Sequence, residues 1–353
     1  MGEVISRVAK KKGIVKAGSL LLLSIPLLWW AIRDIPVADI YATIIGVNPA
    51  ALLGLVLVNG LILLLLVGRW WLVFYALGHR LPFPSLVLYR LAGFGVSYFT
   101  PGPQIGGEPF QVHLLQKHHH LPRGTALAGI SVDKLIEMLL NFSFLFLGLI
   151  LVFKAQLLSI SVLVLPLFAG LLALPVIYMT LIQLGIRPIS LLLMKLSIPD
   201  QWMSTFARIR DHVFSAEEQV ASFVSKNPRY LLGALSLSFI TWALMIFEYW
   251  LTLRLFGVRL ELTQVILMLT AARVAFLMPV PAGLGALEAG QVAAMQILGL
   301  EPTLGISVSL LIRARDFTLG SLGLWLGGFS ASSPRSPSGV QAVPIPLERS
   351  DKV

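Results

Sequence analysis

Six long apolar runs constrain this chain more than any other feature of its sequence. They lie near residues 17–33, 49–77, 124–153, 158–182, 229–256 and 303–328. Each is near or above the roughly 20 residues that a helix needs to cross ~30 Å of hydrocarbon, and backbone groups in lipid must bond within the chain. The composition agrees, since 57% of the 353 residues are hydrophobic and 12% are charged. The sequence predicts an all-α integral membrane protein with about six full transmembrane helices.

Two motifs rich in proline and glycine interrupt the apolar sequence and resemble each other. They are Thr100-Pro-Gly-Pro-Gln-Ile-Gly-Gly-Glu-Pro109 and Met278-Pro-Val-Pro-Ala-Gly-Leu-Gly-Ala-Leu-Glu288. Gly78 lies 23 residues before the first motif's Pro101, and Gly257 lies 22 residues before Pro279. A charged residue follows each motif's glutamate after 25 residues, first Asp133 and then Arg313. The shared order indicates an internal repeat.

Segments 84–120 and 262–300 surround these motifs and differ from the long runs. In each, about 15 apolar residues precede the motif and a second short helix follows. Fifteen helical residues reach only ~22 Å, which is short for a crossing. The pattern predicts two re-entrant helical hairpins whose broken tips expose backbone groups to a ligand. The residues expected at these tips are Pro101, Pro103, Gly106, Gly107, Pro279, Pro281, Gly283 and Gly285.

The arrangement of spans and hairpins predicts an inverted repeat within one membrane domain, residues 1–328. Half one covers about residues 17–153 and half two about 158–328. Each half crosses the membrane three times, or five if the hairpins span fully. Because both numbers are odd, the second half is inverted relative to the first, as in many secondary transporters. The Ser/Pro-rich segment 329–353 is expected to be a disordered cytoplasmic tail.

The net charge of +10 is explained by the positive-inside rule rather than by nucleic acid binding. Basic residues gather where alternating spans would return to the cytoplasm. This places both termini inside the cell and hairpin 84–120 at the cytoplasmic side. The residues concerned are Arg7, Lys10, Lys11, Lys12, Lys16, Arg80, Lys117, Arg123, Arg187, Lys195, Arg208, Arg210, Lys226 and Arg229.

Two clusters of charged residues lie inside the predicted spans. They consist of Asp133, Lys134 and Glu137, and of Arg313, Arg315 and Asp316. Both lie roughly 13–20 Å from the start of their helix, near mid-bilayer, where an unpaired charge costs about 2.5–3.5 kcal/mol. Two interpretations stay open: an ion-pair network that fixes helix packing, or a polar pathway for a charged substrate. A pair between Asp133 and Arg313 across the repeat is one hypothesis.

Glu108 and Glu288 are candidates for a shared substrate or ion site, because each begins a half-helix after a predicted tip. The alternative is a simple helix cap stabilised by the helix dipole. Arg90 and Arg273 precede the motifs and are candidates for phosphate binding, since guanidinium matches phosphate bidentately. Arg69 and Glu248 are weaker candidates that can simply mark helix depth.

No motif of an ATPase, a dehydrogenase or a common hydrolase is present in the sequence. We therefore predict no cofactor and no catalytic residue. The run His118-His119-His120 follows the first hairpin beside Lys117, and we expect it to contact lipid headgroups at the membrane surface. No metal site is predicted.

The paired motifs, with Asp133-Lys134 after the first and Arg313 after the second, resemble a known family. It is the flippase-like family that shares the transmembrane domain of lysylphosphatidylglycerol synthase. The resemblance covers roughly residues 17–328 and implies an integral inner-membrane protein that moves or handles a polar or glycosylated lipid. The synthase members carry an additional soluble aminoacyl-transferase domain, which this chain lacks, so lipid aminoacylation is not expected.

These observations together predict a lipid flippase-like transporter of the inner membrane, with membrane lipids as partners. Glu108 and Glu288 are the candidates for coupling to an ion. Two alternatives remain: a membrane-embedded lipid-modifying enzyme with Glu108 or Asp133 as general base, and an accessory subunit of a separately encoded glycosyltransferase.

Overall fold

The computed structural model describes residues 48–100, 106–154, 164–195, 203–278, 280 and 283–332. Within these ranges the chain forms eleven helices and no strand. They are α3 (Pro49–Ala76), α4 (Phe83–Phe99), α5 (Glu108–His119), α6 (Arg123–Lys154), α7 (Val164–Gln183), α8 (Pro188–Met194), α9 (Met203–Lys226), α10 (Pro228–Leu255), α11 (Leu262–Leu277), α12 (Ala286–Ile297) and α13 (Pro302–Ser332). The predicted span 17–33, the tip prolines Pro101, Pro103, Pro279 and Pro281, and most of the predicted tail lie outside the described residues.

Three helices are long and apolar enough to cross a membrane: α3, α10 and the stretch Arg123–Leu151 of α6. Each corresponds to roughly 42 Å at 1.5 Å per residue, more than the ~30 Å hydrocarbon core. The bent pair Ala169–Gln183 and Pro188–Met194, at 86°, makes a fourth if counted as one span. The described residues thus hold three or four apolar spans where six were predicted for the whole chain. α13 differs because three charged residues lie near its middle, and it continues to Ser332, beyond the predicted end of the membrane domain.

Local sequence sets the ends of the two most similar spans. Asn48 caps α3, its side chain accepting from the Ala50 backbone N–H at 2.9 Å, and a proline follows at the first helical position. Asn227 and Pro228 repeat this pair of residue types at the start of α10. Gly78 and Gly257 follow the two C-termini with φ of +87° and +74°, a conformation that only glycine adopts without strain.

Helices α3–α6 and α10–α13 form two sets with the same order and nearly the same lengths. The lengths are 28, 17, 12 and 32 residues in the first set and 28, 16, 12 and 31 in the second. The start of α10 follows the start of α3 by 179 positions, and the same interval separates the starts of α13 and α6. The correspondence between the twin motifs therefore extends over four helices of each half.

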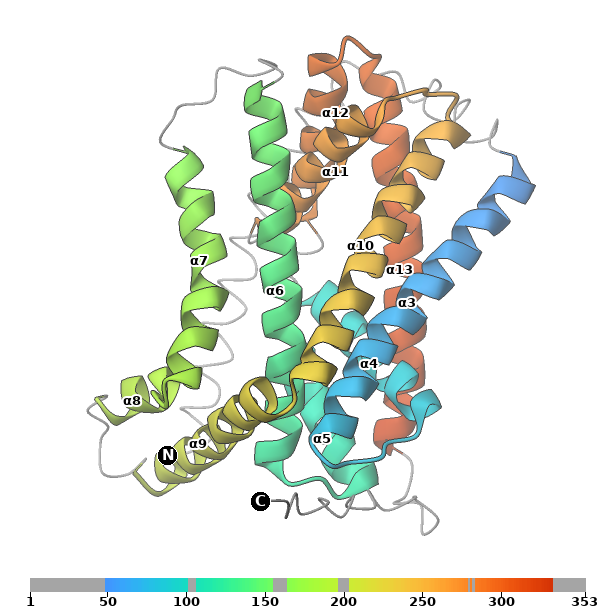
Figure 1. Ribbon diagram of the computed structural model, residues 1–353. Helices are drawn as coiled ribbons and strands as arrows, with labels where there is room; N and C mark the ends of the chain where they lie inside the picture. Colours follow the sequence, from blue (N-terminus) through green and yellow to red (C-terminus); the bar gives the residue numbers. More distant parts are fainter. Residues whose placement is uncertain are drawn as a thin grey trace, which may run out of the picture.

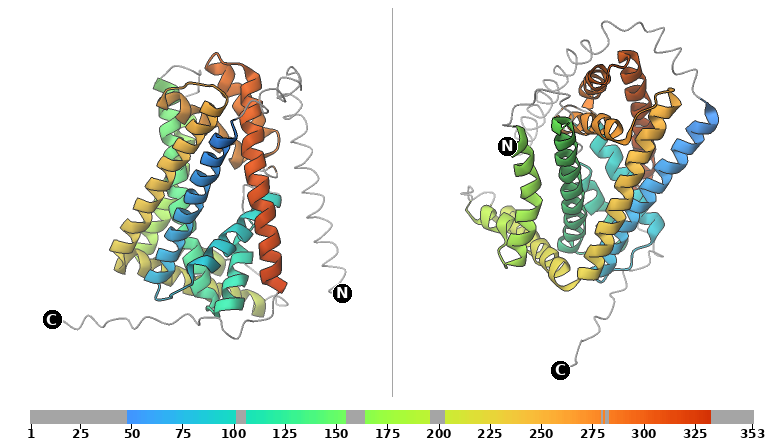
Figure 2. Two further views of the ribbon diagram at one scale, coloured as in Figure 1. Left: turned by 90° about the vertical axis from the view of Figure 1, so that its right-hand side faces the viewer. Right: turned by 45° about the horizontal axis from the view of Figure 1, so that its top comes forward.

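α3 and α10, the first helices of the two sets, run in opposite directions. Asn59, in the first half of α3, donates from its amide to Glu248 in the second half of α10 at 3.4 Å. Arg69, in the second half of α3, donates to Ser238 in the first half of α10 at 3.1 Å. The two helices are therefore antiparallel. Consistently, α4 and α5 lie at one end of the molecule and α11 and α12 at the other (Figure 1, Figure 2).

α4 and α5 pack on each other as one helical hairpin, hairpin 1, and α11 and α12 form a second, hairpin 2. One glutamine side chain bridges each pair: Gln111 donates to the Tyr89 carbonyl at 3.4 Å, and Gln291 to the Met268 carbonyl at 3.1 Å. Glycine allows a close approach in hairpin 1, since a Cβ on Gly107 would overlap the backbone of α4. The hairpins match the two predicted helix–break–helix segments.

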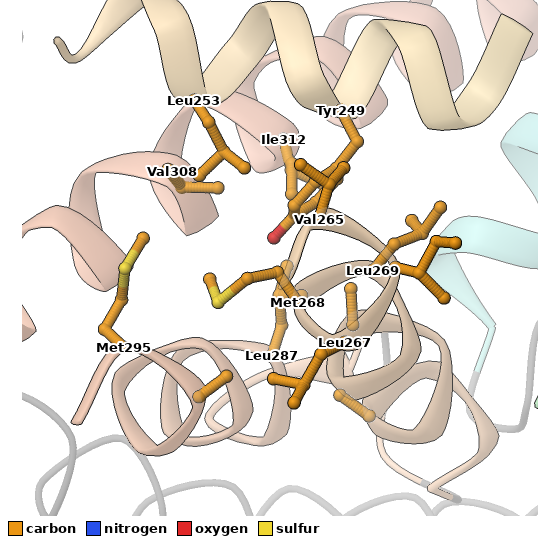
Figure 3. Close-up of a cluster of buried hydrophobic side chains, with 14 of the residues drawn as sticks. Tyr249, Leu253, Val265, Leu267, Met268, Leu269, Leu287, Met295, Val308 and Ile312 are labelled. Carbon is orange, nitrogen blue, oxygen red and sulfur yellow. The ribbon is translucent and has the colours of Figure 1, made fainter. Parts of the chain in front are cut away.

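An apolar core surrounds hairpin 2 (Figure 3). Side chains from five helices converge there: those of the hairpin itself, those of α10 and α13, which cover it, and Phe144 of α6. They include Tyr249, Leu253, Val265, Leu267, Met268, Leu269, Leu287, Met295, Val308 and Ile312.

Hairpin 1 is held against α13 by a row of glycines. A Cβ on Gly323 would overlap the Leu91 backbone carbonyl, and one on Gly95 would lie 2.5 Å from the Gly320 carbonyl oxygen. Small residues at such crossings let membrane helices pack at backbone distance. The first hairpin thus packs mainly on a helix from the other half of the chain.

α7, α8 and α9 form a separate layer against α6. The apolar face of α9 packs on α6 through Ala216, Val220 and Phe223, while Glu218 is exposed. Glu217 accepts from the Ile189 and Ser190 backbone N–H groups at 2.9 and 3.0 Å. This carboxylate fixes the start of α8 on α9.

Candidate functional site

A buried carboxylate joins three helices near the middle of the molecule. Asp133 on α6 pairs with Arg69 on α3 at 2.6 Å and with Arg90 on α4 at 2.5 Å. Only 4% of its side chain is exposed. A buried charge is tolerated only when partners replace its hydration, and two arginines satisfy both carboxylate oxygens here. Arg69 also donates to Ser238, which extends this first network to α10.

Glu137, one helical turn further along α6, is held more loosely. Its oxygens lie 3.3 Å from Lys134 Nζ, 3.4 Å from Arg90 Nη2 and 3.9 Å from Arg69 Nη2. Its side chain is 40% exposed, against 4% for Asp133. This carboxylate therefore borders open space while it remains among cations.

Glu108 connects the tip of hairpin 1 to α6. Its carboxylate accepts from the Gly106 backbone N–H at 2.9 Å and lies 3.4 Å from Lys134 Nζ. A quarter of the side chain is exposed, 25%. The carboxylate thus binds a backbone N–H of the tip and a cation of α6 at the same time.

Glu288 plays the same part in hairpin 2, with stronger contacts. It accepts from the Gly285 backbone N–H at 3.0 Å and from Arg313 Nη2 at 2.7 Å, and Arg313 Nε contacts its other oxygen. Arg313 also donates to the Gly283 carbonyl at 3.0 Å. With 4% of the carboxylate side chain exposed, this bidentate pair fastens the second tip to α13.

The hypothesis of a pair between Asp133 and Arg313 is wrong, because each has partners in its own half. The position equivalent to Arg313 is Lys134: both are the twelfth residue of their helix, and both contact a tip glutamate. One residue changes direction on a helix by about 100°, so counting 25 residues from each glutamate selected the wrong neighbour.

A second network surrounds Arg315 on α13. Its guanidinium contacts Glu248 on α10 at 2.9 Å and Asp316 at 2.8 Å. Asn59 on α3 joins them, since its amide reaches Glu248 and its carbonyl accepts from Arg315 at 3.4 Å. Glu248 and Arg69, expected to be minor, are therefore central members of the two networks.

Arg273 on α11 has a different environment. No carboxylate lies within 4.0 Å of it among the described residues. Its guanidinium lies over the Trp242 ring, 4.9 Å from the centroid, and donates to Met245 Sδ at 3.1 Å. Trp242 in turn stacks on Phe144 of α6 with centroids 4.4 Å apart. This arginine is thus held by an aromatic ring and a thioether instead of an anion.

A central cavity of about 320 Å³ separates Arg273 from the first network. Arg69, Arg90, Lys134, Glu137 and Arg273 line it together with the apolar side chains Leu66, Met138, Phe142, Trp242, Met245 and Phe276. A second hollow of about 240 Å³ shares Arg90, Glu137 and Arg273 and reaches the second network. A third, of about 90 Å³, leads from Glu137 to Glu108 and Asp133. Ionic and apolar walls therefore face each other across one space.

The structure brings the sequence candidates together in three groups. Arg90, Asp133, Lys134 and Glu137 form the first network with Glu108, while Glu288 and Arg313 form the clasp at the second tip, and Arg315 and Asp316 belong to the second network. The tip glycines Gly106 and Gly285 donate backbone N–H groups to the glutamates.

Sequence reasoning missed Asn59, Ser238 and Trp242, which carry no motif. Gln111 and Gln291 had a signal: each lies three residues after a tip glutamate, so that Glu-x-x-Gln occurs in both hairpins.

The histidine run is less exposed than predicted. His119 is buried and its ring contacts the Tyr89 hydroxyl at 3.1 Å, while His118 contacts the Ser330 carbonyl of α13 at 3.0 Å. These contacts join the end of hairpin 1 to the end of α13. Among the described residues, no group of three histidine, aspartate or glutamate side chains is arranged to hold a metal ion.

Residues 18–323 match the family described as the lysylphosphatidylglycerol synthase TM region, which confirms the resemblance drawn from the motifs. A UPF0104 membrane protein of Methanocaldococcus jannaschii is 26% identical over 124 residues, covering 35% of this chain and 37% of that relative. Another from Methanothermobacter thermautotrophicus is 23% identical over 291 residues, covering 76% of this chain and 82% of that relative.

Proposed function

Because the chain belongs to the lysylphosphatidylglycerol synthase TM region family and is an integral membrane protein, we propose that it moves a phospholipid between leaflets, with the headgroup phosphate in the central cavity. Arg273 carries this proposal. It is the one cation of the site that has no carboxylate within 4.0 Å among the described residues, whereas Arg69, Arg90, Lys134, Arg313 and Arg315 each have one.

An unpaired arginine in a membrane cavity favours an anionic ligand. A charge near the bilayer centre costs about 2.5–3.5 kcal/mol, and the Trp242 ring offsets only part of this, about 0.5–2 kcal/mol for a cation–π contact. A phosphate would give the guanidinium two charge-assisted hydrogen bonds. Arg90 lines the same cavity and is positioned to contribute a second guanidinium.

The apolar wall of the cavity suits a lipid rather than a free anion. Met138 and Phe142 on α6, and Trp242 and Met245 on α10, border the space between these two helices. Acyl chains leaving the cavity between α6 and α10 would meet methionine and aromatic side chains while the headgroup stayed among the arginines. Pockets with apolar walls and a few convergent polar groups are typical of such ligands.

The two sets of four helices are, in this proposal, an inverted repeat with re-entrant hairpins. The crosswise bonds from Asn59 to Glu248 and from Arg69 to Ser238 support a pseudo-twofold axis between α3 and α10, because each pair is the other's image after a shift of 179 positions. The arms of the hairpins are 12–17 residues long, roughly 18–26 Å, too short to cross alone. Their tips would enter from opposite leaflets and end beside the networks.

The cytoplasmic side is, in this proposal, the end of the molecule that holds hairpin 1. The basic residues at helix ends support this orientation, because they lie in or next to helices whose ends are at the lower end of Figure 1. These residues are Arg80, Lys117, Arg123, Arg187, Lys226 and Arg229. Both termini would then be cytoplasmic.

Glu108 and Glu288 hold the tips in this scheme and do not themselves carry a coupling ion. Each accepts a hydrogen bond from a backbone N–H and forms an ion pair, so a coupling ion would have to displace one of these contacts. The tip backbone, including Gly283, Gly285, Gly106 and Gly107, would shape the ends of the cavity.

The test is leaflet-resolved lipid movement in proteoliposomes. The probes are tail-labelled phosphatidylglycerol, a polyprenyl phosphate and a phosphate-free glycolipid, with outer-leaflet dye quenched by an impermeant reductant. We expect movement of phosphate-bearing lipids only, and at least a tenfold loss in Arg273→Gln, since a hydrogen bond to a charged group contributes about 1.5–3 kcal/mol. Arg254→Gln is the matched control, because Arg254 stacks on Trp250 at 4.8 Å outside the cavity, and it should move lipid as the native chain does.

Three results would contradict the proposal. Equal movement of the glycolipid, or an unchanged rate in Arg273→Gln, would show that the cavity does not recognise phosphate through Arg273. A new lipid species detected by mass spectrometry without a change of leaflet would favour the enzyme. No movement and no product, with a glycosyltransferase retained on purification, would favour an accessory subunit.

A further inference from the structure

Among the described residues, the two networks, the clasp at the second tip and Arg273 are together electrically balanced. They contain six cations and six carboxylates, three of each in either half of the chain. The cations are Arg69, Arg90, Lys134, Arg273, Arg313 and Arg315, and the carboxylates are Glu108, Asp133, Glu137, Glu248, Glu288 and Asp316. The sequence of the two tips, residues 101–105 and 279–282, contains no charged residue. A phosphate monoanion entering this space would leave one uncompensated negative charge near mid-membrane, which is costly.

Glu137 is the carboxylate best placed to remove that charge. The side chains of Asp133 and Glu288 are 4% exposed, those of Glu248 and Asp316 are 9% exposed, and Glu108 is tied to a backbone N–H. Glu137 is 40% exposed, lines all three hollows, and has no cation nearer than 3.3 Å. It can therefore bind a proton without breaking a short bidentate pair.

We infer that an anionic headgroup enters the cavity together with one proton, which Glu137 takes up. This inference rests on the proposed function. The phosphate diester brings one negative charge, the proton converts the Glu137 carboxylate to a carboxylic acid, and the total charge of the site stays at zero. The cations that had faced Glu137 are released to the phosphate. Lipid and proton then cross together, and no net charge moves.

The groups around Glu137 explain why the proton accompanies the headgroup. Arg69 from α3, Arg90 from α4 and Lys134 from α6 face it directly, and Arg273 from α11 lies across the cavity. Asp133 is adjacent on α6, Glu108 of α5 is reached through Lys134, and α10 contributes Ser238 and Thr241. Glu248 of α10 and the pair Arg315 and Asp316 of α13 share the second hollow with Glu137. Four cations hold Glu137 ionised in the empty site. A phosphate on Arg90 and Arg273 cancels part of their field, and protonation becomes favourable.

The experiment imposes a pH gradient on the same proteoliposomes, with tail-labelled phosphatidylglycerol as the probe. One proton per lipid predicts about a tenfold steady-state excess in the leaflet on the alkaline side for a gradient of one pH unit, since one unit corresponds to 1.36 kcal/mol. A membrane potential set with potassium and valinomycin should change nothing, because the complex is neutral. A pH-sensitive dye inside the vesicles should report protons moving with the lipid.

Variants separate the proton step from movement itself. Glu137→Gln should give no excess of the probe under the gradient, at whatever rate it still moves the probe between leaflets. Glu137→Asp retains the carboxylate and should respond to the gradient. Glu218→Gln, on the exposed face of α9, is the matched control and should behave as the native chain does.

Failure of this inference is distinguishable from failure of the proposed function. If the native chain moves no phospholipid, both are overturned. If it equilibrates phosphatidylglycerol and the gradient has no effect, the lipid moves without a proton and only this inference is wrong. Movement restricted to zwitterionic phospholipids, independent of pH, would also overturn it, because the headgroup's own amine would supply the balancing charge. These results come from the native chain and do not depend on the folding of a variant.

Discussion

The ion pairs at the two hairpin tips, Glu288 with Arg313 and Glu108 with Lys134, are expected to differ strongly in how much they stabilise the fold. Arg313→Gln removes the bidentate partner of Glu288, whose side chain is 4% exposed, and leaves it with the Gly285 N–H. Lys134→Gln removes a single 3.4 Å contact from Glu108, which is 25% exposed. The same type of substitution thus tests a buried ion pair and a partly exposed one.

The expected magnitudes follow from burial. Breaking a buried pair costs about 3–5 kcal/mol because the remaining charge has no counterion. A partly exposed pair contributes about 0–1 kcal/mol, and Glu137 keeps two arginines after the loss of Lys134. For a chain of this size about 2 °C of Tm corresponds to each kcal/mol, so Arg313→Gln should lower Tm by about 6–10 °C and Lys134→Gln by about 2 °C or less.

Intrinsic tryptophan fluorescence of the detergent-solubilised protein, followed on heating, measures these shifts. The double variant Arg313→Gln with Glu288→Gln should recover most of the lost Tm, because neither charge is left alone and the glutamine carbonyl can still accept from Gly285. If Lys134→Gln is as destabilising as Arg313→Gln, or if the double variant is no more stable than Arg313→Gln alone, burial does not determine how strongly each ion pair stabilises the fold.

Two further predictions concern packing and ligand competition. Gly107→Ala should destabilise by about 1–3 kcal/mol because its Cβ would overlap the α4 backbone, whereas Gly60→Ala, with no atom within 4 Å of the new Cβ, should be neutral or stabilising in the same thermal assay. Trp242→Leu removes the ring beneath Arg273. The half-saturating concentration of phosphatidylglycerol in the leaflet assay should then fall about two- to thirtyfold, because a cation–π contact of about 0.5–2 kcal/mol no longer competes with phosphate. An increase would mean that Trp242 instead contacts the lipid.

The helices were predictable from sequence because their causes are local. Runs 49–77 and 229–256 became α3 and α10 with ends displaced by at most one residue. In both, an Asn-Pro pair starts the helix and a glycine with positive φ follows its end. Such signals need no knowledge of neighbouring helices. The hairpins were predictable for the same reason, since proline and glycine interrupt short apolar segments.

The pairing of the charges was not predictable from spacing. Asp133 and Lys134 are adjacent in sequence but point to different partners, one to arginines on α3 and α4 and the other to the tip of hairpin 1. Only the rotation and packing of α6 decide between them. Glu248 likewise gave no sign of its importance, because its partners, Arg315 and Asn59, lie 67 and 189 positions away.

Comparison of equivalent positions separates what the two halves share from what distinguishes them. Each half has a tip glutamate, a cation at the twelfth residue of the long helix and a carboxylate three residues later: Glu108, Lys134 and Glu137 in one, Glu288, Arg313 and Asp316 in the other. These shared triads each carry one net negative charge.

The remaining residues differ, since Arg69 occupies the position of Glu248, and Arg273 and Arg315 have no charged counterparts in the first half. In each half the residues that are not shared carry one net positive charge, which neutralises the triad. They are Arg69, Arg90 and Asp133 in the first half and Glu248, Arg273 and Arg315 in the second. Two sets of helices with the same order and nearly the same lengths thus hold different sets of charges, and in the proposed function a headgroup in the cavity would meet two different walls. If this division is functional, substitutions at Glu288 and Arg313 should mainly lower stability, whereas Arg273→Gln should leave Tm nearly unchanged and reduce lipid movement.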